Sequence, residues 1–239
     1  MLFQFLKKET KLQHFCDLHS HLLPIDDGVK DFSEALLIIK ELENLGFKKL
    51  IVTPHINNRF TNTNKQVLES FNLLEQKIVE EKLSIQLEIA SEYNYDEVFF
   101  ETIKNNSLLS FSKEKYVLFE FHKHHKPLNL EHTIYNLRKL DYQPILAHPE
   151  RYPFYNTLDE YQKLKEMGIL FQINLLSLEK FYSKESYKKV KLLLDNGLVD
   201  FLGSDIHNSS KYLEVFKKSL TSKNYQKIFQ TNTIKNNYL

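Results

Sequence analysis

The stretch DLHSHLLPIDDG, residues 17–28, carries two histidines one residue apart in an apolar segment, followed by two aspartates and a glycine. A strand directs alternate side chains to the same side, so His19 and His21 face the same way and their imidazoles can converge on one point. Convergent imidazoles suit a metal ion. The stretch therefore predicts a buried strand whose end presents metal ligands.

Working outward from this stretch, the chain alternates between strand-like and helix-like segments. The strand-like segments cover residues 15–21, 48–56, 84–94, 115–122, 143–150, 169–178 and 200–207. The helix-like segments cover residues 31–46, 64–83, 96–106, 128–140, 157–168 and 183–197. Asp31 or Ser33 is expected to cap the first helix and Gly46 to end it. Strands that alternate with helices pair in parallel through right-handed crossovers. We therefore predict an α/β fold, a distorted seven-stranded (β/α)7 TIM-like barrel.

The composition limits the class of protein. With 42% hydrophobic and 26% charged residues among 239, the chain is long enough for one large domain with its own core. No linker-like stretch divides it, so we expect a single domain over residues 15–239, preceded by an N-terminal extension over residues 1–14. The net charge is +1 and no basic block stands out, which argues against a nucleic-acid partner.

Cys16 is the single cysteine, which excludes an internal disulfide and fits a reducing compartment. No apolar run approaches the roughly 20 residues that a membrane-spanning helix needs. We therefore expect a cytoplasmic protein with no membrane span. A cysteine-dependent tyrosine phosphatase would need an arginine six positions after its nucleophile, and Leu22 stands there. Cys16 is thus interpreted as a buried strand residue.

Side chains that can bind metal ions recur where the predicted strands end. Parallel barrels build their active sites at this rim, so residues far apart in sequence can meet there. Five histidines and four carboxylates exceed what one or two ions need, which favours a centre of three. The nine predicted ligands are His19, His21, Asp27, His55, Glu92, Glu120, His148, Asp205 and His207.

Each of these residues also has a simpler interpretation. A lone histidine on a strand is more often a satisfied core residue than a ligand. Four carboxylates at one rim, however, would repel each other unless cations held them, so the set as a whole favours a metal centre. The segment HKHHK, residues 122–126, is interpreted as a solvated loop that lines the pocket. The histidines without the strand-end pattern are His14, His122, His124, His125 and His132.

Arginines are rare in this lysine-rich chain, and two of the three follow predicted ligands. Arginine offers a fixed fork of donors that fits phosphate oxygens. We therefore predict Arg151 as the main phosphate clamp and Arg59 as a weaker second one, and we interpret Arg138 as part of a solvated helix face. The tyrosines near the rim, Tyr93, Tyr152 and Tyr155, could stack on an aromatic substrate, but core packing is the favoured interpretation.

The motifs together resemble a known superfamily. They are HSH with DDG, TPH at 53–55, SEY at 91–93, FE at 119–120, AHPERY at 147–152 and GSDIH at 203–207. In this order they resemble the polymerase-and-histidinol-phosphatase (PHP) superfamily. Within it, the chain is most similar to the bacterial metal-dependent tyrosine phosphatases encoded with capsule and exopolysaccharide synthesis genes. The resemblance extends from Cys16 to about Asn208.

The resemblance implies how the ligands are shared among three divalent ions, usually manganese, with iron, zinc or magnesium chemically admissible. The loop LLPIDDG is one residue shorter than in the family, so Asp26 stays an alternative to Asp27. One ion would be held by His19, His21, Glu92 and Asp205, a second by Glu92, Glu120 and His148, and a third by Asp27, His55 and His207.

The implied activity is hydrolysis of phosphotyrosine by a hydroxide that bridges the metal ions. A phenolate has a parent pKa of about 10, so it leaves with little help from a general acid. The expected substrate is a phosphotyrosine protein, the cytoplasmic tail of a membrane-bound tyrosine kinase of polysaccharide synthesis. Two alternatives stay open: a PHP phosphatase of a small metabolite such as histidinol phosphate, and a non-catalytic module that keeps the fold.

Overall fold

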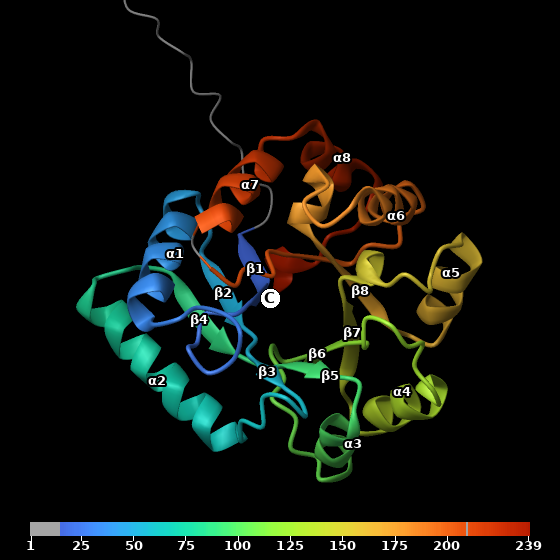
Figure 1. The fold of residues 1–239 in the computed structure, drawn as a ribbon, viewed down its shortest axis with the longest axis horizontal. Coiled ribbons are helices and arrows are strands. Elements are labelled where there is room, and N and C mark those ends of the chain that lie inside the picture. The colour runs from blue at the N-terminus through green and yellow to red at the C-terminus, as the bar shows by residue number, and fades with distance from the viewer. Residues whose placement is uncertain (1–14, 209) are drawn as a thin grey trace, which may run out of the picture.

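The computed structural model describes residues 15–208 and 210–239, and the predicted extension over residues 1–14 lies outside the described residues. In Figure 1 the strands run through the middle of the molecule and the helices surround them. Among the described residues, every pairing of two strands is parallel, and Phe111 forms one isolated antiparallel bridge with Tyr116. The prediction of a parallel α/β fold is therefore confirmed.

The predicted count of seven strands is wrong, because the described residues form nine strands in two sheets. The three-stranded sheet has the order β1-β2-β4, and the six-stranded sheet has the order β3-β5-β6-β7-β8-β9. The strands are β1 (Cys16–Ser20), β2 (Lys49–Val52), β3 (His55–Ile56), β4 (Gln86–Ile89), β5 (Glu92–Asn94), β6 (Tyr116–Glu120), β7 (Gln143–Ala147), β8 (Leu170–Asn174) and β9 (Phe201–Gly203).

The extra strands arise because two predicted strands each divide in the middle. The segment 48–56 divides into β2 and β3 around Pro54, which has no backbone N–H to continue a ladder. The segment 84–94 divides next to it, and the N–H of Glu92 donates to the Pro54 carbonyl at 3.1 Å. His55 and Glu92 therefore begin the short strands β3 and β5, where they are direct partners, instead of ending long strands.

Other predicted strands also end early. The segment 169–178 forms β8 only as far as Asn174 and then turns into the short 3-10 helix η2 (Leu175–Glu179). After β7, His148 leads into η1 (Pro149–Arg151). Asp205 and His207 lie beyond the end of β9. Five of the nine predicted ligands thus lie on loops or turns, which gives each side chain more freedom of direction than a strand would.

The helices follow the predicted periodicity. Asp31, and not Ser33, caps the first helix by accepting a hydrogen bond from the N–H of Glu34. The second and fifth helices begin with capping boxes at Thr63 and Thr157. The helices are α1 (Phe32–Asn44), α2 (Asn64–Glu80), α3 (Glu97–Lys104), α4 (Leu130–Lys139), α5 (Leu158–Glu166), α6 (Lys184–Asp195), α7 (Ser210–Leu220) and α8 (Lys223–Thr231). The last two, and η3 (Asn236–Tyr238), lie where no element was predicted.

The first and last strands, β1 and β9, are neighbours and are tied by polar contacts. Ser20 forms an isolated parallel bridge with Ile206. The buried carboxylate of Asp17 accepts hydrogen bonds from the N–H and the hydroxyl of Ser204, at 2.8 Å and 2.6 Å. Burial raises the pKa of Asp17 to about 6, although these hydrogen bonds act against the rise. These contacts bring the predicted ligands at the end of β1, His19 and His21, close to those that follow β9, Asp205 and His207.

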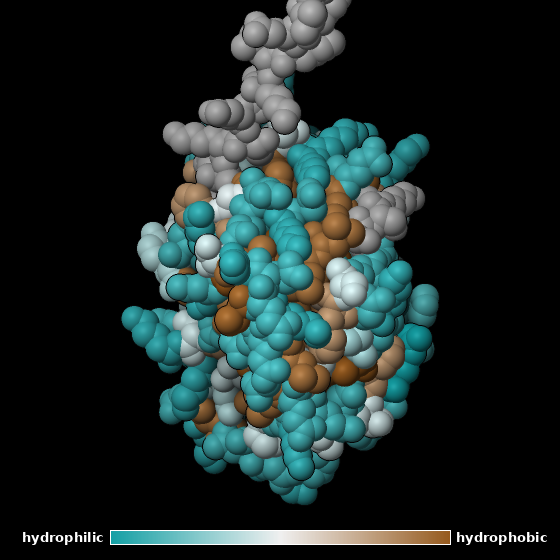
Figure 2. All heavy atoms as spheres, turned by 90° about the vertical axis from the view of Figure 1, so that its left-hand side faces the viewer, coloured by the Kyte–Doolittle hydropathy of each residue, from teal (hydrophilic) through white to brown (hydrophobic). Residues whose placement is uncertain are grey.

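Two apolar layers support the strands. The larger one lies between strands and helices, and a smaller cluster contains Leu18, Ile51, Leu118, Ile145 and Phe201. The face that carries α1 and α2 is mainly hydrophilic, with apolar side chains showing between the polar ones (Figure 2). In the part of the chain that the structure describes, no helix is long and apolar enough to cross a membrane.

Candidate metal centre

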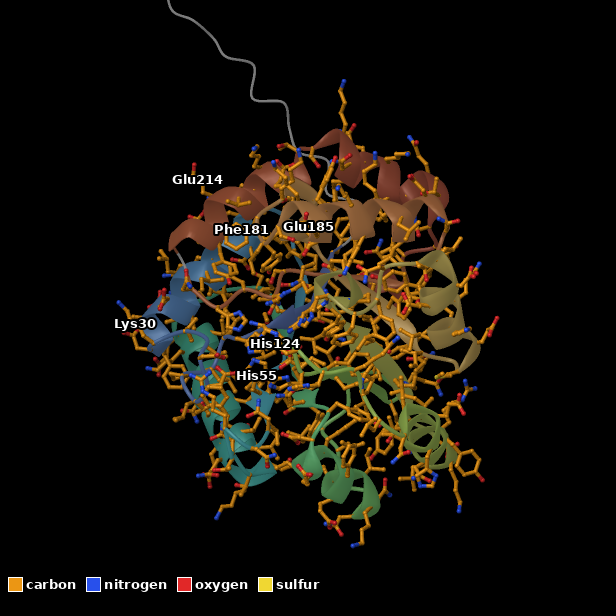
Figure 3. The ribbon with its side chains drawn as sticks, turned by 45° about the vertical axis from the view of Figure 1, so that its right-hand side comes forward. Lys30, His55, His124, Phe181, Glu185 and Glu214 are labelled. Carbon is orange, nitrogen blue, oxygen red and sulfur yellow. The ribbon has the colours of Figure 1, made fainter. Side chains whose placement is uncertain are left out.

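The nine predicted ligands converge on one pocket. The pocket has a volume of about 530 Å³ and includes both predicted phosphate-binding arginines in its lining. In Figure 3 His55 lies near the middle of the molecule close to His124 of the loop after β6, whereas Lys30 and Glu214 lie at its periphery. Seven of the nine line the pocket directly, and the remaining two, His19 and His21, lie fully buried beneath it.

Glu92 lies at the centre of the cluster. Its Oε2 lies 3.2 Å from His19 Nε2 and 3.3 Å from His21 Nε2. The same oxygen lies 3.3 Å from His55 Nδ1, and Oε1 lies 3.2 Å from His148 Nε2. Burial alone would raise the pKa of Glu92, but His19 and His55 hold it well below its usual range. This carboxylate therefore stays ionised and can serve several cations at once.

Asp205 is the second buried carboxylate of the cluster. Its Oδ1 lies 3.5 Å from His19 Nε2 and 3.5 Å from His207 Nδ1. Its backbone has a φ of +52°, a left-handed conformation that costs a non-glycine residue of the order of 1 kcal/mol. A hydrogen bond of 2.8 Å from its N–H to the His19 carbonyl holds it there. His148 has a φ of +36°, so two predicted ligands occupy strained backbone positions.

Asp26 and Asp27 have different environments. Asp26 accepts hydrogen bonds from His21 Nδ1 at 2.9 Å, from the N–H of His55 at 2.8 Å and from the N–H of Gly28 at 2.9 Å. Burial alone would raise its pKa, but His21 holds it at about 2. Asp27 instead reaches the pocket, where its Oδ1 lies 3.5 Å from His55 Nε2. Asp26 is thus occupied in orienting a histidine, whereas Asp27 is available to a metal ion.

A close backbone contact explains why the third residue of the DDG motif, Gly28, is a glycine. A Cβ at this position would lie 2.3 Å from the His21 carbonyl oxygen and 2.6 Å from the His21 Cβ. Only glycine allows the loop to fold back so closely on the first strand.

The donor set fits divalent cations. His19 Nδ1 donates to Gln172 Oε1 at 2.9 Å and His21 Nδ1 donates to Asp26, so the Nε2 atoms of both histidines are turned toward the pocket. These two Nε2 atoms lie 3.1 Å apart. Burial alone would lower the pKa of His21, but Asp26 and Glu92 raise it well above its usual value. The site thus favours a positive charge at this point, which a metal ion can supply in place of a proton.

Two buried histidine nitrogens provide a second test of whether the site fits metal ions. Within the described residues, Nδ1 of His55 and Nδ1 of His148 make no hydrogen bond. Burial and the nearby Arg151 lower the pKa of His148 to about 4, so this imidazole is neutral and keeps a lone pair. Three groups of side chains have ligand atoms within 4.8 Å of one another: His21 with His55 and His207, His19 with His21 and Asp205, and His55 with Glu92 and Glu120.

Comparison with known proteins agrees with this site. The chain matches the family described as capsular polysaccharide synthesis, CpsB/CapC, over residues 15–236. It belongs to the CpsB/CapC family. The chain is 31% identical to the tyrosine-protein phosphatase YwqE of Bacillus subtilis over 196 residues, which cover 80% of this chain and 77% of YwqE. It is 30% identical to CapC of Staphylococcus aureus over 195 residues, which cover 80% of this chain and 76% of CapC.

Solved structures give the same family. One solved structure comes from work on YwqE of Bacillus subtilis and CpsB of Streptococcus pneumoniae, which are described as metal-dependent tyrosine phosphatases. It superposes on this chain with a TM-score of 0.75 at 27% sequence identity, and the match covers 92% of this chain and 96% of the solved one. The histidinol phosphate phosphatase of Lactococcus lactis shares the fold, with a TM-score of 0.52 at 15% identity over 86% of this chain and 94% of its own. The resemblance to the capsule-associated tyrosine phosphatases is confirmed.

In this member of the CpsB/CapC family, the two arginines predicted to bind phosphate, Arg151 and Arg59, have different environments. Arg151 is mostly buried, and its Nη1 donates to Asp205 Oδ2 at 2.6 Å. Its guanidinium also lies over the Tyr182 ring, 4.5 Å from the centroid. Arg59 has a side chain that is 75% exposed, and its Nη1 lies 3.7 Å from Asp27 Oδ2. Arg151 is therefore held in place at the pocket, and Arg59 lies at its edge.

Sequence reasoning missed the polar residues of β8. Gln172 Nε2 donates to Asn174 Oδ1 at 2.8 Å, and Asn174 Nδ2 donates to Asp205 Oδ2 at 2.6 Å. Together with the bond from His19 to Gln172, this makes a continuous chain of hydrogen bonds between two predicted ligands. The signal was the alternation of polar side chains in FQIN, residues 171–174, inside an otherwise apolar segment.

Gly203 makes room for this network. A Cβ there would lie 2.7 Å from Gln172 Nε2 and 2.7 Å from His19 Cβ. Glu150, also missed, accepts hydrogen bonds from the N–H of Asn174 at 2.9 Å and from the Ser177 hydroxyl at 2.7 Å. These buried partners orient ligands from behind, as outer-shell groups do in metal sites.

The aromatic residues behave as the core interpretation predicted. Tyr93, Tyr152 and Tyr155 are buried. The histidines of residues 122–126 are exposed, and two of them, His122 and His124, line the pocket. Cys16 is buried, and burial raises the pKa of its thiol far above the usual value, so it remains a protonated thiol.

Proposed function

We propose that this chain is a metal-dependent protein tyrosine phosphatase. The observation that carries the proposal is the convergence of five histidines and four carboxylates, drawn from seven separate segments, on one pocket. The named activity of YwqE and the description of the solved YwqE and CpsB structures support the same reaction. The substrate is accordingly a phosphotyrosine side chain of a protein.

The nine predicted ligands would hold three divalent ions, manganese by preference, with iron, zinc or magnesium as substitutes. His19, His21, Glu92 and Asp205 would hold one, Glu92, Glu120 and His148 another, and Asp27, His55 and His207 the third. Asp26 would orient His21 and bind no metal. When bound in such a donor set, divalent ions lower the pKa of coordinated water and offset the charge of phosphate oxygens.

The side chains of the chain itself prepare the substrate. Arg151 can turn its free guanidinium nitrogens to two phosphate oxygens, because one nitrogen is anchored on Asp205 and the plane is supported by Tyr182. Arg59 adds a weaker contact from the pocket edge. The phenolate of tyrosine leaves without a strong acid, so the pocket needs no dedicated proton donor for it.

A fold of one domain over residues 15–239 is part of this proposal. We propose that the two sheets together form the distorted barrel of the PHP fold, supported by the bridge between Ser20 and Ile206 and by the fold shared with histidinol phosphate phosphatase. The proposed physiological substrate is the tyrosine-rich cytoplasmic tail of a membrane-bound kinase of polysaccharide synthesis. The capsule-related description of the family supports it, and the phosphatase would then act in the cytoplasm.

The alternative substrate is a small metabolite such as histidinol phosphate. The likeness to the enzyme that acts on it, at 15% identity, concerns the fold alone. A test therefore compares hydrolysis of a phosphotyrosine peptide with that of histidinol phosphate, on protein whose metal content is measured by elemental analysis. We expect bound divalent metal and preference for the peptide. Preference for histidinol phosphate would contradict the substrate class, and metal-free protein with full activity would contradict the mechanism.

The clamp is tested separately with Arg151→Ala. Loss of a charge-assisted hydrogen bond to phosphate is expected to lower kcat/KM by about ten- to a hundredfold while metal content is kept. Normal turnover of an aryl phosphate by this variant would show that Arg151 is not the clamp.

A further inference from the structure

A second pocket lies directly beside the metal pocket. Its volume is about 550 Å³, and we call it the flanking pocket, lined by Tyr95, Phe100, Ile103, His125, Leu128 and Asn136 among others. It lies between α3, α4 and the loop that follows β6. Four residues line both pockets: Tyr95, Asp96, Phe121 and His122. The two pockets are therefore adjacent and share these walls, so a peptide bound in the metal pocket can reach the flanking pocket with a neighbouring side chain.

Tyr95 forms a fixed wall between the two pockets. Its ring makes edge-on contacts with Phe100 at a centroid distance of 4.9 Å and with Phe121 at 5.8 Å. Its hydroxyl donates to the Leu128 carbonyl at 2.7 Å and lies 2.8 Å from Thr133 Oγ1. The loop after β6 is thus tied to α3 and α4, and these contacts fix the walls of the flanking pocket.

Large apolar side chains of this pocket are exposed to solvent. The Leu128 side chain lies on the loop at 80% exposure and Phe100 lies on α3 at 37%. The lining carries both signs of charge: it includes Lys126 and the carboxylates Asp96 and Glu97, of which Asp96 caps α3 by accepting a hydrogen bond from the N–H of Phe99. Such a surface suits an apolar side chain of a peptide.

We propose that the flanking pocket binds an apolar side chain next to the phosphotyrosine in a polypeptide substrate. The inference rests on the phosphatase function proposed above and adds a second contact to it. A phosphotyrosine in the metal pocket places the neighbouring residues of an extended peptide a few ångströms from its own Cα, toward the shared wall at Tyr95. A small phosphorylated metabolite has no such neighbouring side chain, so this pocket favours protein substrates.

The test uses two phosphotyrosine peptides of equal length and charge, one with leucines on both sides of the phosphotyrosine and one with alanines. We expect the wild-type protein to hydrolyse the leucine peptide with about five- to tenfold higher kcat/KM, through a lower KM. In Leu128→Asp and, separately, Phe100→Ala, this ratio should fall toward one. The matched control is Val79→Asp on α2, at a residue that is 75% exposed and lines neither pocket. This variant should keep the wild-type ratio.

A binding measurement removes the dependence on turnover. Fluorescence anisotropy with the same two peptides, carrying a non-hydrolysable phosphonate in place of the phosphate, should show the same loss of preference in Leu128→Asp. If the wild-type protein hydrolysed and bound the leucine and alanine peptides equally well, the proposed role of the flanking pocket would be wrong, whereas the phosphatase function would still hold. No hydrolysis of either peptide by metal-loaded protein would overturn the phosphatase function itself.

Two further outcomes also decide against the proposal. If Leu128→Asp slowed hydrolysis of the small substrate p-nitrophenyl phosphate as much as that of the leucine peptide, the side chain would act on the metal pocket and not on a neighbouring residue. If sedimentation velocity showed that Leu128→Asp dissociates a dimer, the pocket would be an interface between two copies of the chain.

Discussion

The apolar part and the ligand-bearing C-terminal end of the same strands have different roles, one in the stability of the fold and the other in the metal site. On the N-terminal side of the predicted ligands lie residues of the small apolar cluster, such as Leu18, Leu118 and Ile145, at the middle of their strands and all fully buried. One to three residues further along lie His19, Glu120 and His148, whose charges and lone pairs face one pocket. The first end stabilises the fold by removing apolar surface from water, whereas the second gathers like charges and strained backbone at a cost in stability.

The difference teaches where each kind of residue can be changed. Substitutions in the apolar cluster should affect unfolding and spare the metal ions. Substitutions at the polar end should affect metal binding and activity, and can even leave stability unchanged, because they relieve repulsion among buried charges. The following variants test this separation.

The largest effect is expected at Glu92, which contacts four histidines. Glu92→Gln removes the charge that the ions share, so metal content should fall and aryl phosphate hydrolysis should drop by about a thousandfold or more. Elemental analysis and steady-state kinetics measure both. The matched control is Glu75→Gln, an exposed carboxylate on α2, which should behave as wild type. Full metal content and activity in Glu92→Gln would remove Glu92 from the centre.

The next effect is expected at Gln172, which orients His19 without facing the pocket. Gln172→Leu leaves His19 Nδ1 without its acceptor, and the affinity for Mn²⁺ should fall by about ten- to a hundredfold in a calorimetric titration. Gln172→Glu keeps an acceptor oxygen and should recover most of the affinity. Equal affinities for all three proteins would mean that Gln172 serves packing alone.

At the apolar end, Leu118→Ala should lower the free energy of unfolding by about 2–5 kcal/mol, because it leaves a cavity in a fully buried cluster. Its affinity for Mn²⁺ should stay at the wild-type value. Leu73→Ala, at a residue that is 49% exposed on α2, is the control and should change stability by about 0.5 kcal/mol or less. A large loss of metal affinity in Leu118→Ala would break the separation between the two ends.

The smallest effect is expected at Arg59. Because its side chain is mostly exposed, Arg59→Ala should raise KM for an aryl phosphate by about two- to fivefold and leave kcat unchanged. An effect as large as that of Arg151→Ala would make Arg59 an equal clamp.

Local sequence patterns were enough for much of this protein. The two-residue period of His19 and His21 acts within a few residues, and so does the cap at Asp31, one of the two caps that the sequence left open, so their structure follows from local geometry. The family resemblance followed from the order of the motifs, and the parallel α/β class followed from the alternation of strand-like and helix-like segments.

The tertiary structure decided what depends on partners distant in sequence. Pro54 interrupts the strand 48–56 locally, but the division of the strand 84–94 beside it depends on the hydrogen bond from the Glu92 N–H to the Pro54 carbonyl. The different environments of Asp26 and Asp27 are set by His21 and His55. The link between His19 and Asp205 runs through Gln172 and Asn174, side chains that look like ordinary strand residues in the sequence. A hydrogen bond or an ion pair depends on distance in space, and a linear pattern holds that distance only for close neighbours along the chain.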